Sequence, residues 1–99
     1  MNTLPIGTIV YTKGGLKKLM VVARKLFKDI DGEKKYFDYG ACLYPEGLLD
    51  SNVVYFNGED IESVFKMGFS DDDNEELNRR IETWEKQTKL KKGSINDME

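Results

Sequence analysis

The sequence has 99 residues, of which 39% are apolar and 33% charged, so its size and composition are those of one folded domain rather than a disordered chain. Its net charge of −3 argues against a general binder of nucleic acids or anionic membranes. The negative charge is uneven, because residues 1–69 hold nine acidic and nine basic side chains whereas residues 70–99 hold nine and six.

The N-terminal half predicts an extended segment and then a long hairpin. Leu4-Pro5 favours extended backbone, and alternating β-branched residues over 6–12 predict a first strand. Residues 19–27 and 36–44 predict two long strands, joined where Asp31-Gly32 can adopt the positive φ angles of a tight turn. Both arms are apolar on both faces, so we expect other strands to cover them.

Two further strands are predicted after this hairpin. Pro45 ends the second arm, residues 53–56 predict a short strand, and Asn57-Gly58 predicts the turn that follows. Residues 59–64 then predict one helical turn, and residues 64–69 predict a fifth strand. A helix over 59–67 is the competing interpretation, because Ile61 and Val64 have helical spacing.

The C-terminal third predicts one amphipathic helix. Ser70 is a candidate N-cap with a carboxylate at Asp73, and the helix is expected to continue to about Leu90. Its acidic residues lie early and its lysines late, which complements the helix dipole. One face of the helix carries Leu77, Ile81 and Trp84.

These elements predict a mainly β (α+β) protein. Residues 1–69 are expected to form a five-stranded antiparallel, small, SH3-like, partly open barrel, with a twisted sheet as the alternative. Residues 70–91 form the helix, packed either on this barrel or on a partner, and residues 92–99 form a disordered tail.

No residue pattern points to catalysis, a cofactor or a metal. The chain has no histidine, which removes the commonest general base and metal ligand. Cys42 lies mid-strand among apolar neighbours and is interpreted as core packing. The acidic runs at 59–62 and 71–73 lack the ligand spacing of a calcium loop, and the glycines form no phosphate-binding loop. We therefore expect a protein that is not an enzyme.

The cysteine content and hydropathy also suggest a location. Cys42 is the only cysteine, so no intramolecular disulfide can form and a reducing compartment is expected. No apolar run reaches the length of a membrane span, and no signal peptide is recognised. The expectation is a cytoplasmic protein with no membrane partner.

Two candidate interaction surfaces remain. Trp84, with Leu77 and Ile81, could bind a partner protein or could cover the open end of the barrel, and the sequence does not choose between these two roles. Self-association through this helix is compatible with either. Lysines of the hairpin region surround Tyr11, Phe27, Tyr36 and Phe37, as in barrels that bind single-stranded nucleic acid, but lysines near strand edges more often serve solubility.

Several ordered segments resemble one bacterial family. These segments are residues 4–10, 13–15, 18–24, 38–47 and 55–64, among them the run Asp38-Tyr39-Gly40-Ala41-Cys42 and the run Tyr55-Phe56-Asn57-Gly58-Glu59. Over about residues 4–72 the chain is similar to the domain of unknown function 4176 family, found mostly in Firmicutes. The helix from Asp73 onward lies outside the recognisable pattern.

The resemblance implies a genetic context rather than a chemistry. Family members are frequently encoded beside type VII secretion genes and their LXG-type toxins, and they carry no known catalytic residues. The implied function is a non-enzymatic, cytoplasmic protein-binding module, such as an accessory, chaperone or targeting factor for a secreted toxin. An immunity-like protein that neutralises a toxin, and a small nucleic-acid-binding barrel, are the alternatives.

Overall fold

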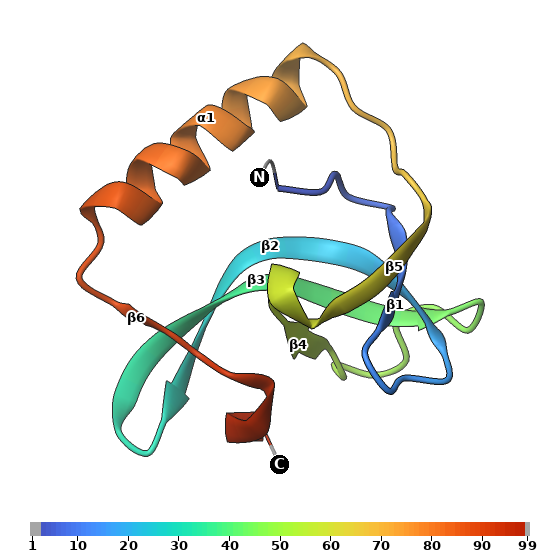
Figure 1. The fold of residues 1–99 in the computed structure, drawn as a ribbon, viewed down its shortest axis with the longest axis horizontal. Coiled ribbons are helices and arrows are strands. Elements are labelled where there is room, and N and C mark those ends of the chain that lie inside the picture. The colour runs from blue at the N-terminus through green and yellow to red at the C-terminus, as the bar shows by residue number, and fades with distance from the viewer. Residues whose placement is uncertain (1–2, 99) are drawn as a thin grey trace.

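The computed structural model describes residues 3–98, and it shows a curved, mainly antiparallel sheet with one helix beside it (Figure 1). The sheet has the order β4-β3-β2-β1-β5, and β6 pairs in parallel with β3. The strands are β1 (Ile9–Thr12), β2 (Lys18–Ile30), β3 (Glu33–Tyr44), β4 (Val54–Phe56), β5 (Ile61–Lys66) and β6 (Lys91–Lys92). A mainly β fold with one α-helix is thus confirmed over the described residues.

The β2–β3 hairpin is the centre of the fold, as predicted. Asp31 and Gly32 form its turn with φ angles of 52° and 82°, which is the geometry that the Asp-Gly pair favours. The pairing slips by one residue between Val21 and Ala23, opposite Gly40. A Cβ on Gly40 would collide with the side chain of Leu26 and would lie 2.8 Å from Cγ1 of Val53, so glycine at this position leaves room for both side chains beside the bulge.

The core forms where the curvature of the sheet brings four strands together. It contains side chains from β1, β2, β3 and β4, namely Val10, Leu19, Val21, Tyr39, Ala41 and Phe56. The sheet is open, because β4 and β5 are the two ends of its strand order and each pairs with one neighbour. A closed barrel is therefore not formed by the described residues.

The segment after β4 follows the turn-then-strand prediction. Residues Gly58–Asp60 form a short 3₁₀ turn (η1), and β5 begins at once and pairs with β1. The competing helix over 59–67 is wrong, because this segment completes the ladder of β1, a gain that local helical spacing does not reveal. The strand begins three residues earlier than the predicted start at Val64.

The helix α1 (Asp72–Gln87) differs from the prediction at both ends. Its N-cap is Asp71, whose side chain accepts a hydrogen bond from the Asn74 backbone N–H at 3.1 Å. The prediction of Ser70 as the cap is wrong, and Ser70 Oγ instead accepts from the Asn74 side chain at 3.0 Å. The helix ends at Gln87 rather than Leu90, because Thr88 adopts extended backbone.

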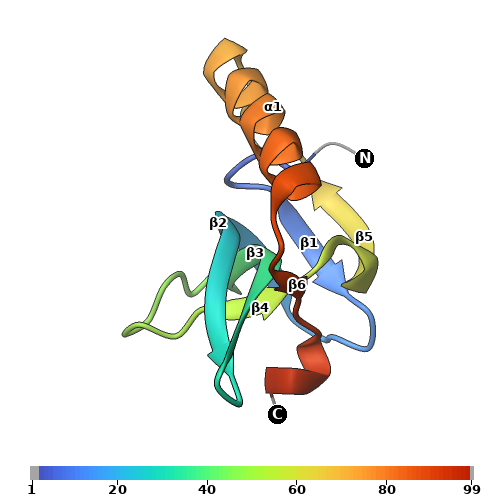
Figure 2. The same ribbon diagram turned by 90° about the vertical axis from the view of Figure 1, so that its left-hand side faces the viewer.

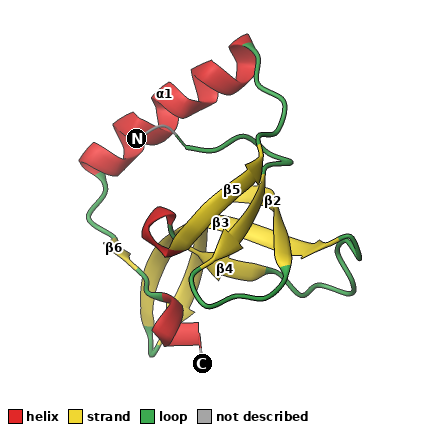
Figure 3. Cartoon of the chain, turned by 45° about the vertical axis from the view of Figure 1, so that its right-hand side comes forward, coloured by secondary structure: helices red, strands yellow, loops and turns green. Residues whose placement is uncertain are grey.

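The C-terminal residues lie against the sheet, where the sequence predicts a disordered tail over 92–99. Lys91 and Lys92 form β6 beside β3, and the Gly93 N–H donates to the Tyr36 carbonyl at 2.7 Å. A second 3₁₀ turn, η2 (Ile95–Met98), follows. Figure 3 shows α1 beside the sheet and the chain that continues from it through β6 to η2 along the sheet. Residue 99 of the predicted tail lies outside the described residues, as do residues 1 and 2 of the predicted barrel.

Candidate protein-binding surfaces

The predicted helix face is mostly used inside the molecule. Ile81 is 7% exposed, and the Trp84 ring lies 5.6 Å from the ring of Phe27 and 5.1 Å from that of Tyr36, centroid to centroid. Leu77 is 41% exposed and lies outside these contacts. The structure therefore does not bring Leu77, Ile81 and Trp84 together on one exposed surface, and partner binding by this set stays a prediction.

Polar contacts also hold α1 to the hairpin. The Arg24 guanidinium donates to the side-chain oxygen of Asn74 at 2.6 Å, and the Lys25 ammonium lies 3.1 Å from the Glu85 carboxylate. A mainly apolar pocket of about 190 Å³ remains between helix and hairpin, lined by Lys25, Phe27, Arg80, Ile81 and Trp84. The helix thus packs on its own sheet, which is one of the two roles left open for it.

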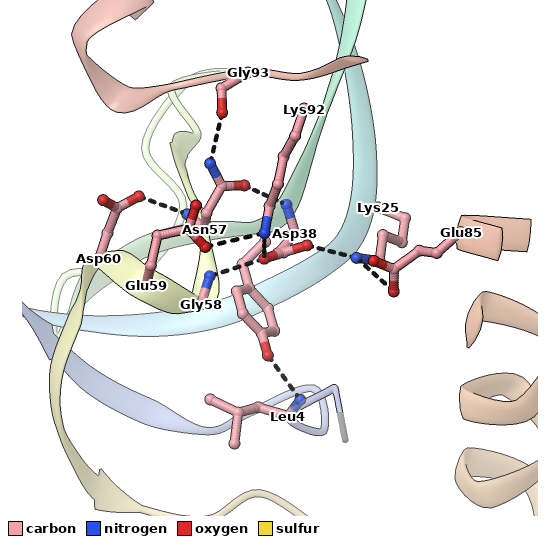
Figure 4. Close-up of polar contacts among 11 residues, drawn as sticks. Leu4, Lys25, Asp38, Asn57, Gly58, Glu59, Asp60, Glu85, Lys92 and Gly93 are labelled. Carbon is pink, nitrogen blue, oxygen red and sulfur yellow. Dashed lines mark hydrogen bonds and ion pairs between the residues drawn. The ribbon is translucent and has the colours of Figure 1, made fainter. Parts of the chain in front are cut away.

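Asp38 is the centre of a polar network that links distant segments (Figure 4). Its carboxylate accepts from the Lys25 ammonium at 2.5 Å, from the Gly58 N–H at 2.8 Å and from the Lys92 ammonium at 2.8 Å. Lys25 continues to Glu85 on α1, and Lys92 continues to Glu59 at 3.0 Å. One buried carboxylate therefore connects β3 with the helix, the η1 turn and the C-terminal strand.

The charges in this network shift one another's pKa values. Burial alone would raise the pKa of Asp38, but the Gly58 N–H and the two ammonium groups outweigh it and lower that pKa. Burial lowers the pKa of Lys92, yet its contacts with Asp38 and Glu59 raise it overall. The hydrogen bond from Lys92 lowers the pKa of Glu59. All three groups are therefore charged at neutral pH.

Asn57 satisfies the backbone around the same network. Its side-chain oxygen accepts from the Asp38 N–H at 2.9 Å, and its side-chain NH₂ donates to the Gly93 carbonyl at 2.7 Å. Its own N–H donates to Asp60 at 2.9 Å. Because these buried polar groups are satisfied by one another, the network is best explained as a structural tie.

Cys42 and the acidic side chains were the candidates for chemistry. Cys42 is 2% exposed, in agreement with its predicted place in the core. No group of three or more Cys, Asp or Glu side chains that could hold a metal ion is found in residues 3–98. Over the same range, no helix is long and apolar enough to span a bilayer.

The hairpin lysines lie over aromatic rings rather than around an open aromatic face. Lys34 lies 4.8 Å from the Phe27 ring centroid and Lys28 lies 5.4 Å from that of Tyr55. Tyr36 and Phe37, two of the aromatic residues expected to stack on bases, are buried. Binding of nucleic acid remains an untested alternative, without an observation that favours it.

The first exposed apolar surface, the β4 surface, lies at one end of the sheet. It consists of exposed side chains at the end of β3, in the following loop and in β4, namely Tyr44, Leu48, Leu49 and Val54. A pocket of about 190 Å³ lies within it, lined by Leu43, Gly47, Leu49, Asn52 and Val54. A second pocket of about 330 Å³ extends along β4 to η2, lined by Thr12, residues 53–56 and Ile95.

The second exposed apolar surface, the β5 surface, lies at the opposite end. It comprises Val64, Phe65, Met67 and Phe69, and Phe65 is 63% exposed. The Lys18 ammonium lies over the Phe65 ring at 4.3 Å from its centroid. Sequence reasoning did not identify these two edges, because strand order depends on long-range pairing.

The fold and these surfaces define a small β protein with two apolar sheet edges. The chain matches the family named domain of unknown function (DUF4176) over residues 3–77 and belongs to that family. The match extends beyond the expected limit at residue 72 and includes the start of α1, but it ends before Ile81 and Trp84. No curated protein and no solved structure matches the chain.

Proposed function

We propose that this protein is a non-enzymatic protein-binding module that takes an extended apolar segment of a partner protein at the β4 surface. The observation that carries this proposal is the pair of pockets beside an edge strand. Val54 lines both pockets, and within residues 3–98 β4 pairs with β3 alone. A strand added at such an edge gains backbone hydrogen bonds, while alternate side chains fill pockets and give specificity.

The β4 surface is better suited to the family's common function than the helix face. All four of its residues lie within the matched residues 3–77, whereas Ile81 and Trp84 lie beyond them. Of the residues that line its two pockets, Ile95 alone lies beyond the match. Its leucines and Val54 also remain exposed, while Ile81 is buried and Trp84 contacts Phe27 and Tyr36. These aliphatic side chains are about half exposed, so covering each of them would contribute roughly 1 kcal/mol to binding, before the costs of association.

The chain's resemblance to a family whose members are frequently encoded beside type VII secretion genes and LXG-type toxins supports a specific partner class. We infer that the partner is a secreted LXG-type toxin, or a component of its type VII secretion system, and that this protein acts in the cytoplasm as an accessory, chaperone or targeting factor. Apolar segments of a toxin that await export need cover in water, and the β4 surface offers it. An immunity-like protein would use the same surface against a folded toxin.

The test is affinity purification from the native bacterium with the wild-type chain and matched variants. Leu49→Asp and Val54→Lys place charges at the β4 pockets and should remove a toxin or secretion component that the wild type retains in high salt. Leu77→Asp, an equally exposed site on α1, is the control and should retain it. Loss with Leu77→Asp but retention with both β4 variants would assign binding to the helix and overturn the proposal.

A second readout separates the alternatives. If RNA co-purifies with the protein at low salt and is lost as the salt concentration rises, nucleic-acid binding would replace the proposed function. Protection of cells from a co-produced toxin, abolished by Val54→Lys, would assign the immunity-like function to the β4 surface.

A further inference from the structure

β5 differs from the other strands in its exposure. It pairs with β1 along one edge only, and all of its residues except Ile61 are exposed, so both faces and the second edge meet solvent. Figure 2 shows β5 as the outermost strand at the right, beside β1. An exposed edge strand leaves a row of backbone N–H and C=O groups unpaired, and these groups readily pair with another strand.

The residues of β5 are complementary to themselves in an antiparallel arrangement. When two copies pair about a two-fold axis through Val64, Glu62 of each copy faces Lys66 of the other, and Ile61 faces Met67. Ser63 faces Phe65, and the two Val64 side chains face each other. The two-fold axis therefore forms the Glu62–Lys66 pair twice, and apolar side chains meet on both faces of the joined strands.

Neighbouring registers lack this match. About Ser63, Lys66 would face Asp60, which lies in the η1 turn rather than in β5, and Glu62 would face the apolar Val64. About Phe65, Lys66 would face Val64 and Glu62 would face Gly68. Within one copy, Glu62 and Lys66 are exposed and have no ion-pair partner among the described residues, so both are available.

We propose that two copies of this chain associate through β5 as an antiparallel pair centred on Val64. The sheets then join into one, with β5 strands at the centre and a β4 edge at each end. The dimer goes beyond the proposed function, because it occupies the opposite edge from the β4 surface. It makes the protein bivalent, with two partner sites facing outward from one continuous sheet.

Charge reversal tests the pairing. Glu62→Lys and Lys66→Glu each place like charges opposite one another twice, so each should weaken dimerisation by about tenfold or more. The double variant Glu62→Lys/Lys66→Glu restores opposite charges and should recover the wild-type dimer. The association constant is measured by sedimentation with light scattering, and circular dichroism verifies that each variant is folded.

Cysteine cross-linking tests the register. Facing Cα atoms of an antiparallel pair lie about 4.5–5.5 Å apart, within the range of a disulfide, so oxidised Val64→Cys should run as a covalent dimer on a non-reducing gel. Ser63→Cys, which faces Phe65 of the other copy, is the control and should stay uncross-linked. Cys42 is buried and serves as the background in both variants.

Several results would overturn the dimer. These are a monomer mass for the wild type at about 1 mM, a dimer indifferent to both charge reversals, or cross-linking at Ser63→Cys without cross-linking at Val64→Cys. Failure of the dimer is separable from failure of the proposed function, because partner capture depends on Leu49 and Val54. A monomeric Glu62→Lys variant that still captures the partner would leave the β4 proposal intact.

Discussion

At the residue scale, Asp38 is the side chain whose loss should cost most. Asp38→Ala would leave the Gly58 N–H without its acceptor and would remove the shared partner of Lys25 and Lys92. Breaking a buried, hydrogen-bonded charge pair typically costs about 3–5 kcal/mol, so we expect a loss of about 3 kcal/mol in the free energy of unfolding. Urea denaturation at pH 7 measures it. A change below about 1 kcal/mol would show that the network is not a structural tie.

Asp38 should also make the stability of the protein depend on pH. The pKa of Asp38 in the folded chain is lowered from its ordinary value of 3.8, so its contribution is fully present above that value and is lost as pH falls through the lower folded pKa. Wild type should therefore lose stability below about pH 4 more steeply than Asp38→Asn, in urea denaturation from pH 7 to pH 2. Parallel curves for the two chains would contradict this assignment.

Some residue-scale features could be predicted and others could not, for a physical reason. Asp31-Gly32 and Cys42 follow from local rules, since a turn requires positive φ and a mid-strand thiol among apolar neighbours favours burial. The ion pair of Asp38 with Lys92 joins residues 54 positions apart, and no local sequence pattern near either residue predicts it. Long-range polar partners depend on the completed fold.

At the element scale, α1 should be stabilised by Trp84 rather than by Leu77. Trp84→Ala removes the contacts with the Phe27 and Tyr36 rings, and we expect a loss of about 1–3 kcal/mol, less than for a fully buried tryptophan. Leu77→Asp, at an exposed position, should change stability by less than about 0.5 kcal/mol. Thermal and urea unfolding followed by circular dichroism compare the two variants. Equal losses would show that the helix packs by its Leu77 side.

The strands and the helix could be predicted where the local sequence pattern favours the same structure as the long-range strand pairing. The β2–β3 hairpin, β4 and α1 all have local signals, although the helix cap is Asp71, which accepts from the Asn74 N–H, rather than Ser70. β6 has no such signal, since two lysines carry no hydrophobic alternation. Its place comes from the free edge of β3, which accepts backbone hydrogen bonds whatever the side chains are.

At the scale of the whole molecule, the openness of the sheet connects fold with proposed function. The prediction of a small β fold with one helix is confirmed, but the apolar surfaces arise from which strands end the sheet, β4 and β5. Strand order is set by non-local pairing, so the sequence alone does not indicate which strands end the sheet. A closed barrel would have no such edges.

The C-terminal segment should be an integral part of this molecule rather than a dispensable tail. Deleting residues 89–99 would remove β6, the hydrogen bond from Asn57 to Gly93 and the ion pair of Lys92 with Asp38. It would also uncover Phe37, whose ring lies against Gly93. We expect a loss of about 2–5 kcal/mol, because a buried charge pair is broken and apolar surface is exposed together.

The matched control for this deletion is Lys91→Ala in the full chain. Lys91 is exposed and its ammonium lies 3.9 Å from Glu33, a surface pair that contributes less than about 1 kcal/mol. Urea denaturation of both proteins gives the comparison, and the slope of unfolding free energy against urea concentration reports the surface exposed. If the deletion cost no more than Lys91→Ala, the segment would contribute as little as the disordered tail that the sequence predicts over 92–99. A larger loss, accompanied by a smaller slope, would mean that residues beyond the family match contribute to the fold they follow.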